Sequence, residues 1–100
     1  MSYVVRFTVD SKIDVDDAVD WYRRKSPAYA TRFARAVDRT LDLIEAMPNS
    51  FPKADQIVRV AKTRKFPYGI YFEIDGDEIL IIAVCHLSRD SRVWKSRKIQ

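Results

Sequence analysis

The stretch "FPYGIYFEIDGDEILIIAVCH", residues 66–86, decides the fold of this chain. Apolar side chains occupy alternate positions in its first part, which is the periodicity of a strand with one buried face. The triplet at 75–77 combines two acids with a glycine and predicts a tight turn. The last part, 79–86, is apolar on both faces, so we expect this strand in the middle of a sheet. The residues on the buried face of the first strand are predicted to be Phe66, Tyr68, Ile70, Phe72 and Ile74.

Two other stretches have the pattern of strands. Residues 3–10 alternate along their length, and residues 57–63 precede the hairpin through a short basic link, Arg64–Lys65. The predicted sheet therefore has four strands. The core-facing set of the first strand is predicted to be Tyr3, Val5, Phe7 and Val9.

A first helix is predicted between these strands. Asp14 is a suitable N-cap, and Asp16 and Asp17 would then lie in the first turn, beside the positive end of the helix dipole. The helix is expected to run from Asp14 to about Lys25.

A second helix is predicted to begin at Ser26 as the cap and Pro27 in the first position, and to end at Pro48. Because the two helices are joined so tightly, they should form an antiparallel hairpin. The apolar stripe of the second helix comprises Ala30, Phe33, Ala34, Val37, Leu41 and Ile44. The opposite side carries Arg32, Arg35, Asp38, Arg39 and Asp42.

The order of elements is β-α-α-β-β-β. It predicts an α+β fold in which a helical hairpin packs on one face of a mainly antiparallel four-stranded sheet. The 100 residues are enough for one domain, 1–100, and two glycines are few for an all-β protein. The second face of the sheet is expected to be partly open and to carry Arg59 and Tyr71.

The sequence indicates a cytoplasmic protein without a membrane span. Its longest apolar run, 79–85, is too short to cross a bilayer, and the N-terminus lacks the order of a signal peptide. The single cysteine, Cys85, cannot form an internal disulfide and is expected to be a small buried apolar residue.

The net charge of +4 comes from the C-terminal half. Residues 1–52 carry eight basic and eight acidic side chains, whereas residues 53–100 carry ten and six. Residues 89–100 alone carry five basic side chains and one acid. This asymmetry favours an anionic partner, either a nucleic acid or an acidic protein segment.

Several kinds of chemistry do not fit the sequence. One histidine, one cysteine and no clustered acids cannot form a zinc site, and two glycines cannot form a phosphate-binding loop, so no cofactor is expected. A nucleophile would need His86 as its base, yet no carboxylate is placed by the sequence to orient that ring.

Metal-free RNA cleavage stays open as an enzymatic interpretation. It requires side chains that transfer protons. It also requires cations that stabilise the negative charge of the phosphate in the transition state. His86 or Glu73 could transfer protons, and Arg59, Arg64 and Arg89 could supply charge. Alternatively, His86 could be a structural histidine at a strand end, bonded to the backbone, and Glu73 a solvated acid on a strand.

The C-terminal segment supports a binding interpretation. Asp90 can cap a short turn or helix from which Val93 and Trp94 pack inward. Guanidinium groups bridge carboxylates or phosphates through two parallel hydrogen bonds, which suits an acidic partner. The candidate binding residues are Tyr71, Arg89, Arg92, Trp94, Lys95 and Arg97, with Lys98 beside them.

Residues 58–97 carry a family resemblance. An arginine-bearing strand is followed by "FPY", an acidic turn, an apolar strand that ends in "VCH", and "SRDSRVW". The helical half adds "WY", "SP" and "RF", at spacings that are also typical of the family pattern named next. With this order of elements, the chain resembles the RelE/ParE toxin superfamily of type II toxin–antitoxin (plasmid stabilisation) modules.

The resemblance implies a toxin that inhibits growth unless a cognate antitoxin with an acidic segment holds it. RelE-like members resemble ribosome-dependent mRNA endoribonucleases (mRNA interferases), whereas ParE-like members block DNA gyrase. His86 and Arg89 match an "H..R" pattern common in ParE-like sequences. RelE-like nucleases commonly have a tyrosine or paired cations near the end of the last strand, whereas this chain has no tyrosine after Tyr71. The resemblance therefore favours the ParE-like branch. The nuclease and a module that retains only antitoxin binding stay open.

Overall fold

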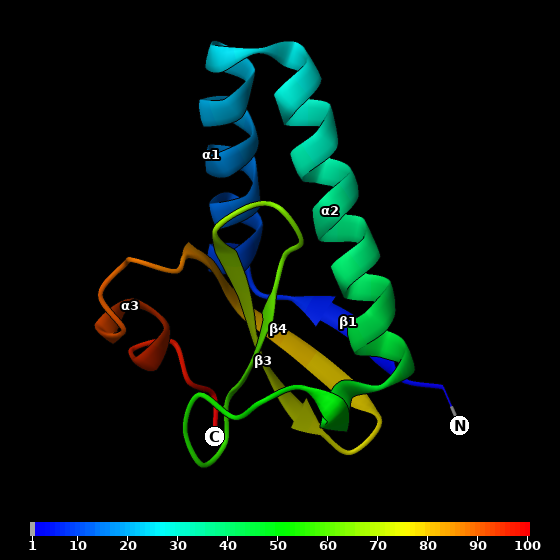
Figure 1. Cartoon of the computed structure of the whole chain (residues 1–100). Helices are drawn as coiled ribbons and strands as arrows, with labels where there is room; N and C mark the ends of the chain where they lie inside the picture. Colours follow the sequence, from blue (N-terminus) through cyan, green and yellow to red (C-terminus); the bar gives the residue numbers. More distant parts are fainter. Residues whose placement is uncertain (1) are drawn as a thin grey trace.

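The computed structural model describes residues 2–100 and confirms the predicted α+β fold. Its four-stranded sheet has the order β1-β4-β3-β2, with β1 parallel to β4 and the other neighbours antiparallel (Figure 1). The longest strand, β4, lies inside the sheet as its apolar sequence predicts. The strands are β1 (Val4–Phe7), β2 (Arg59–Lys62), β3 (Tyr68–Asp75) and β4 (Glu78–His86).

The β3–β4 hairpin turns where the acidic triplet predicts. Gly76 has a φ of 61°, in the left-handed region that glycine adopts without steric cost. Within the hairpin, Tyr71 pairs with Ala83 but Phe72 pairs with Ile81, so Ile82 is an extra residue in β4. This bulge directs both Ile82 and Ala83 toward the second face of the sheet.

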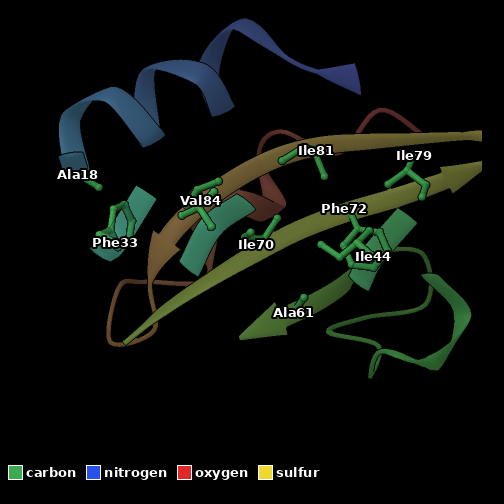
Figure 2. Close-up of a cluster of buried hydrophobic side chains, with 10 residues drawn as sticks. Ala18, Phe33, Ile44, Ala61, Ile70, Phe72, Ile79, Ile81 and Val84 are labelled. Atoms are coloured by element: carbon green, nitrogen blue, oxygen red, sulfur yellow. The ribbon is translucent and has the colours of Figure 1, made fainter. Parts of the chain in front are cut away.

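Two antiparallel helices, α1 (Val9–Lys25) and α2 (Pro27–Ala46), cover one face of the sheet (Figure 1). Pro27 is the first residue of α2, and Pro48 begins a short 3₁₀ turn, η1 (Pro48–Ser50), as expected from the sequence. The buried side chains of α2 follow the predicted stripe and meet the sheet in one cluster (Figure 2). Members of that cluster include Phe33, Val37, Ile44, Ile70, Phe72 and Ile79.

The predicted start of the first helix was wrong. The strand ends at Phe7, and Thr8 caps α1: its hydroxyl accepts a hydrogen bond from the backbone N of Ser11 at 3.1 Å. The helix therefore begins five residues before Asp14, and Val9, expected to face the core, is 75% exposed. Asp14 therefore lies inside α1 and does not cap it. Its carboxylate has other partners, which are described below.

The second face of the sheet is partly open, as expected, because Val4 and Arg6 of β1 are 51% and 66% exposed there. Its β3–β4 part is covered. The C-terminal segment, with a single helical turn α3 (Arg92–Lys95), lies over it. Trp94 is buried and stacks on Tyr71, with ring centroids 5.1 Å apart and an interplanar angle of 14°. Cys85 is buried beneath, as expected, and its burial raises the pKa of its thiol.

Arg59 was also misplaced. Its guanidinium donates to the carbonyl oxygens of Phe51 at 2.6 Å and Asn49 at 3.3 Å, so it fastens the segment after α2 instead of projecting from an open face. No helix within residues 2–100 is long and apolar enough to span a membrane.

Candidate binding cleft and C-terminal cations

A cleft of about 530 Å³ lies between α1 and the end of the β3–β4 hairpin. We call it the α1 cleft. Aromatic rings supply much of its lining, and the histidine and one arginine singled out in the sequence lie at its edge. Its main lining residues are Trp21, Tyr22, Tyr68, His86 and Arg89, together with the acids Asp14 and Asp17.

His86 is held by the turn that follows β4. Its Nδ1 lies 2.7 Å from Ser88 Oγ and accepts a hydrogen bond from the backbone N of Ser88 at 3.1 Å. Its ring also packs edge-on against Tyr68, with centroids 5.4 Å apart. These contacts fix the orientation of the His86 ring at the edge of the cleft.

The two tyrosines of the α1 cleft remain protonated near neutral pH. Burial is the largest cause that raises the pKa of Tyr22 and also that of Tyr68. Their rings meet Phe33 in one aromatic cluster, at centroid distances of 5.0 Å each. The cleft wall is therefore rigid and largely apolar, which suits binding more than proton transfer.

The candidate nuclease residues are not gathered in one place. His86 and Arg89 share the α1 cleft, but Arg64 borders a different groove and Arg59 is bonded to the segment after α2. Glu73 is fully buried, and its carboxylate accepts hydrogen bonds from the backbone of the last two residues, Ile99 at 2.7 Å and Gln100 at 3.2 Å. Sequence alone suggested a solvated acid there. Within residues 2–100 no group of three side chains could hold a metal ion.

Three of the five C-terminal cations have carboxylate partners within the chain. Arg97 lies 2.5 Å from Asp14, and Arg92 lies 2.6 Å from Asp90. The hydrogen bond that Arg97 donates to the Asp14 carboxylate is the largest cause that raises the pKa of Arg97. Lys98 contacts a third carboxylate, that of Asp55, at 2.8 Å. Arg97 and Lys98 therefore fasten the C-terminal segment to α1 and to the loop before β2, whereas the Arg92–Asp90 pair lies within that segment.

The two other C-terminal cations are available to solvent. Arg89 borders the α1 cleft, and neither it nor Lys95 forms an ion pair within residues 2–100. Lys95 lies over the ring of Trp94, 5.6 Å from its centroid. Both are exposed, whereas Trp94 is buried beneath Lys95 and stacks on Tyr71.

A second groove, of about 700 Å³, was missed by the sequence reasoning. It runs between α2 and the β2–β3 link, and we call it the α2 groove. The signal was present: Arg32, Arg35 and Arg39 recur at spacings of three and four, which places them along one side of a helix. The basic link at 62–65 faces them across the groove.

Comparisons with known proteins agree with this architecture. A family model described as the ParE toxin of the type II toxin–antitoxin system parDE matches residues 5–91. A solved structure of the chromosomal ParDE toxin–antitoxin system from P. aeruginosa has a TM-score of 0.74 to this chain at 19% identity, and the match covers 84% of this chain and 95% of the other. None of the curated proteins matches the chain in sequence. The chain belongs to the ParE toxin family of type II toxin–antitoxin systems.

Proposed function

We propose that residues 1–100 act as one toxin domain that inhibits DNA gyrase in the cytoplasm and is neutralised by a cognate antitoxin. The observation that carries the proposal is membership of the ParE toxin family over residues 5–91. The dispersal of Glu73, Arg59 and Arg64 away from the α1 cleft supports a toxin that acts by binding.

The antitoxin is expected to dock at the α1 cleft. Trp21 is 51% exposed there, beside Tyr22, and could be covered by the apolar side of an amphipathic helix. Arg89, Arg92 and Lys95 would attract the acidic extension of that helix. Tyr71, Trp94 and Arg97 would support this surface from beneath.

Binding of the purified chain to the product of the neighbouring gene tests the docking site. Trp21→Ala and Arg89→Glu should each weaken the affinity at least about tenfold in calorimetry, because anchors at an interface centre dominate its energy. The control Met47→Ala removes an equally exposed apolar side chain outside the cleft and should leave the affinity unchanged. Equal losses in all three variants would refute this site.

Expression of the chain in bacteria tests the toxin role. Growth should stop, reporter plasmids should become relaxed as gyrase is blocked, and co-expression of the antitoxin should restore both. If the antitoxin binds but the chain neither stops growth nor relaxes plasmids, the chain is a module that retains only antitoxin binding.

The alternative of a ribosome-dependent mRNA endoribonuclease has one observation in its favour, the shared position of His86 and Arg89 at the α1 cleft. Toeprinting on translating ribosomes separates the two functions. We expect no new cleavage products. Products that disappear in the variant carrying His86→Gln and Arg59→Ala would establish the nuclease instead.

A further inference from the structure

The α2 groove carries a strong positive charge. Six cations line it and no acid does. All six are exposed, and none forms an ion pair within residues 2–100. They are Arg32, Arg35 and Arg39 of α2, and Lys62, Arg64 and Lys65 of β2 and its link. Six unpaired like charges repel one another, so the groove favours an anionic occupant.

The groove is built on fixed backbone. The side chain of Thr63 donates toward the carbonyl oxygens of Phe66 and Tyr68 at 2.9 and 3.1 Å, and thereby closes the β2–β3 link. Lys65 in that link has a φ of 68°, a conformation that is rare for residues other than glycine. The facing row on α2 spans about 10 Å from Arg32 to Arg39, at 1.5 Å per helical residue. The cations are therefore presented in two rows whose spacing the fold sets.

The apolar contacts of the groove do not form a strip. Its two large exposed apolar side chains, Tyr29 and Leu43, are 50% and 47% exposed. They stand fourteen residues apart on α2, or about 21 Å. An amphipathic acidic helix needs large apolar anchors at three- and four-residue spacing, whereas between Tyr29 and Leu43 the groove is lined by the small side chains of Ala36 and Thr40 beside three arginines.

We propose that the α2 groove binds single-stranded nucleic acid through its phosphate backbone. Four of the six cations are arginines, whose planar guanidinium groups hold phosphate oxygens through paired hydrogen bonds. Tyr29 lies at one end with the guanidinium of Arg32 over its ring, 5.6 Å from the centroid, and offers a surface on which an unpaired base stacks. This activity goes beyond gyrase inhibition and antitoxin binding, and its failure would leave both proposals untouched.

Fluorescence anisotropy with the purified full chain and a labelled oligothymidylate of about 12 nucleotides tests the proposal. The variant carrying Arg35→Gln, Arg39→Gln and Arg64→Gln should bind at least about tenfold more weakly. Its slope of log affinity against log salt should be shallower by about 2, since each phosphate contact contributes about 0.7 on a single strand. Tyr29→Ala keeps every cation and should still weaken binding about fivefold or more through lost stacking.

The matched control carries Lys12→Gln, Arg24→Gln and Lys53→Gln, three exposed cations outside both hollows. It changes the net charge equally and should keep most of the affinity and the salt slope. Equal losses in the two triple variants would overturn the proposal, because binding would then follow overall charge. A duplex of the same length, or a polyglutamate peptide, that binds as tightly and loses affinity in the groove variant would also overturn it, in favour of a duplex or an acidic protein.

Discussion

Asp14 connects three distant parts of the chain. Its carboxylate accepts hydrogen bonds from the backbone N of Val84 at 2.9 Å and from the guanidinium of Arg97 at 2.5 Å. Only 9% of the Asp14 side chain is exposed, so its charge depends on these partners. Sequence reasoning made Asp14 a cap because local spacing suited that role. The true partners lie 70 and 83 residues away, and no local pattern reveals them.

The variant Arg97→Ala should therefore lose about 3 kcal/mol of unfolding free energy, since it leaves a buried carboxylate without its cation. For a chain of this length the melting temperature should fall by about 10 °C or more. The control Arg92→Ala breaks an exposed pair and should leave the melting temperature nearly unchanged. Similar melting temperatures for Arg97→Ala and the wild type would contradict this role.

Asp55 should titrate well below an ordinary carboxyl. The hydrogen bond from Lys98, followed by those from the backbone of Val58 and Ile57, lowers its pKa from 3.8 to about 2. Because the folded pKa is depressed, the ionised group contributes stability that is fully present above about pH 4 and is lost as the pH falls toward 2. NMR titration of the side-chain carboxyl should show this value. Lys98→Met should raise the pKa toward 3.8, and an ordinary pKa in the wild type would refute the contact.

At the scale of elements, the sequence predicted what local periodicity determines. The alternation in 66–74 located β3, and the stripe from Ala30 to Ile44 located α2. The start of α1 was missed because Val9 continues the strand alternation while Thr8 supplies the cap. The inward packing of Trp94 from a short turn after Asp90 was predicted, but its partner was not, because the stacking of Trp94 on Tyr71 depends on tertiary contact.

The C-terminal segment is an integral part of the fold, and its removal should show this. Truncation of residues 99–100 takes away both backbone donors of the buried Glu73 carboxylate. Urea unfolding should report a loss of about 3 kcal/mol, because the oxygens of a buried carboxyl group lose their hydrogen-bond donors. The same truncation in a Glu73→Gln background should cost clearly less, because a neutral amide remains. Equal losses in both backgrounds would show that the two hydrogen bonds contribute nothing.

At the scale of the whole molecule, the placement of charge differs from the sequence expectation. The C-terminal surplus was expected to project toward a partner, yet Arg92, Arg97 and Lys98 are paired with the chain's own carboxylates. Six unpaired cations gather in the α2 groove, where two segments separated in sequence come together. Composition predicted an anionic partner, but only the tertiary structure shows which face carries free charge. The sequence singled out His86 and Arg89, which lie together at the α1 cleft, but it predicted neither that cleft nor the α2 groove, because both depend on which elements pack together.

The central claim is that this toxin acts on gyrase, and the supercoiling of relaxed plasmid by purified gyrase tests it most directly. Micromolar toxin, with its fold verified by circular dichroism, should abolish the supercoiled product on an agarose gel. Prior addition of the cognate antitoxin should restore that product. Unchanged supercoiling at every toxin concentration would contradict the claim.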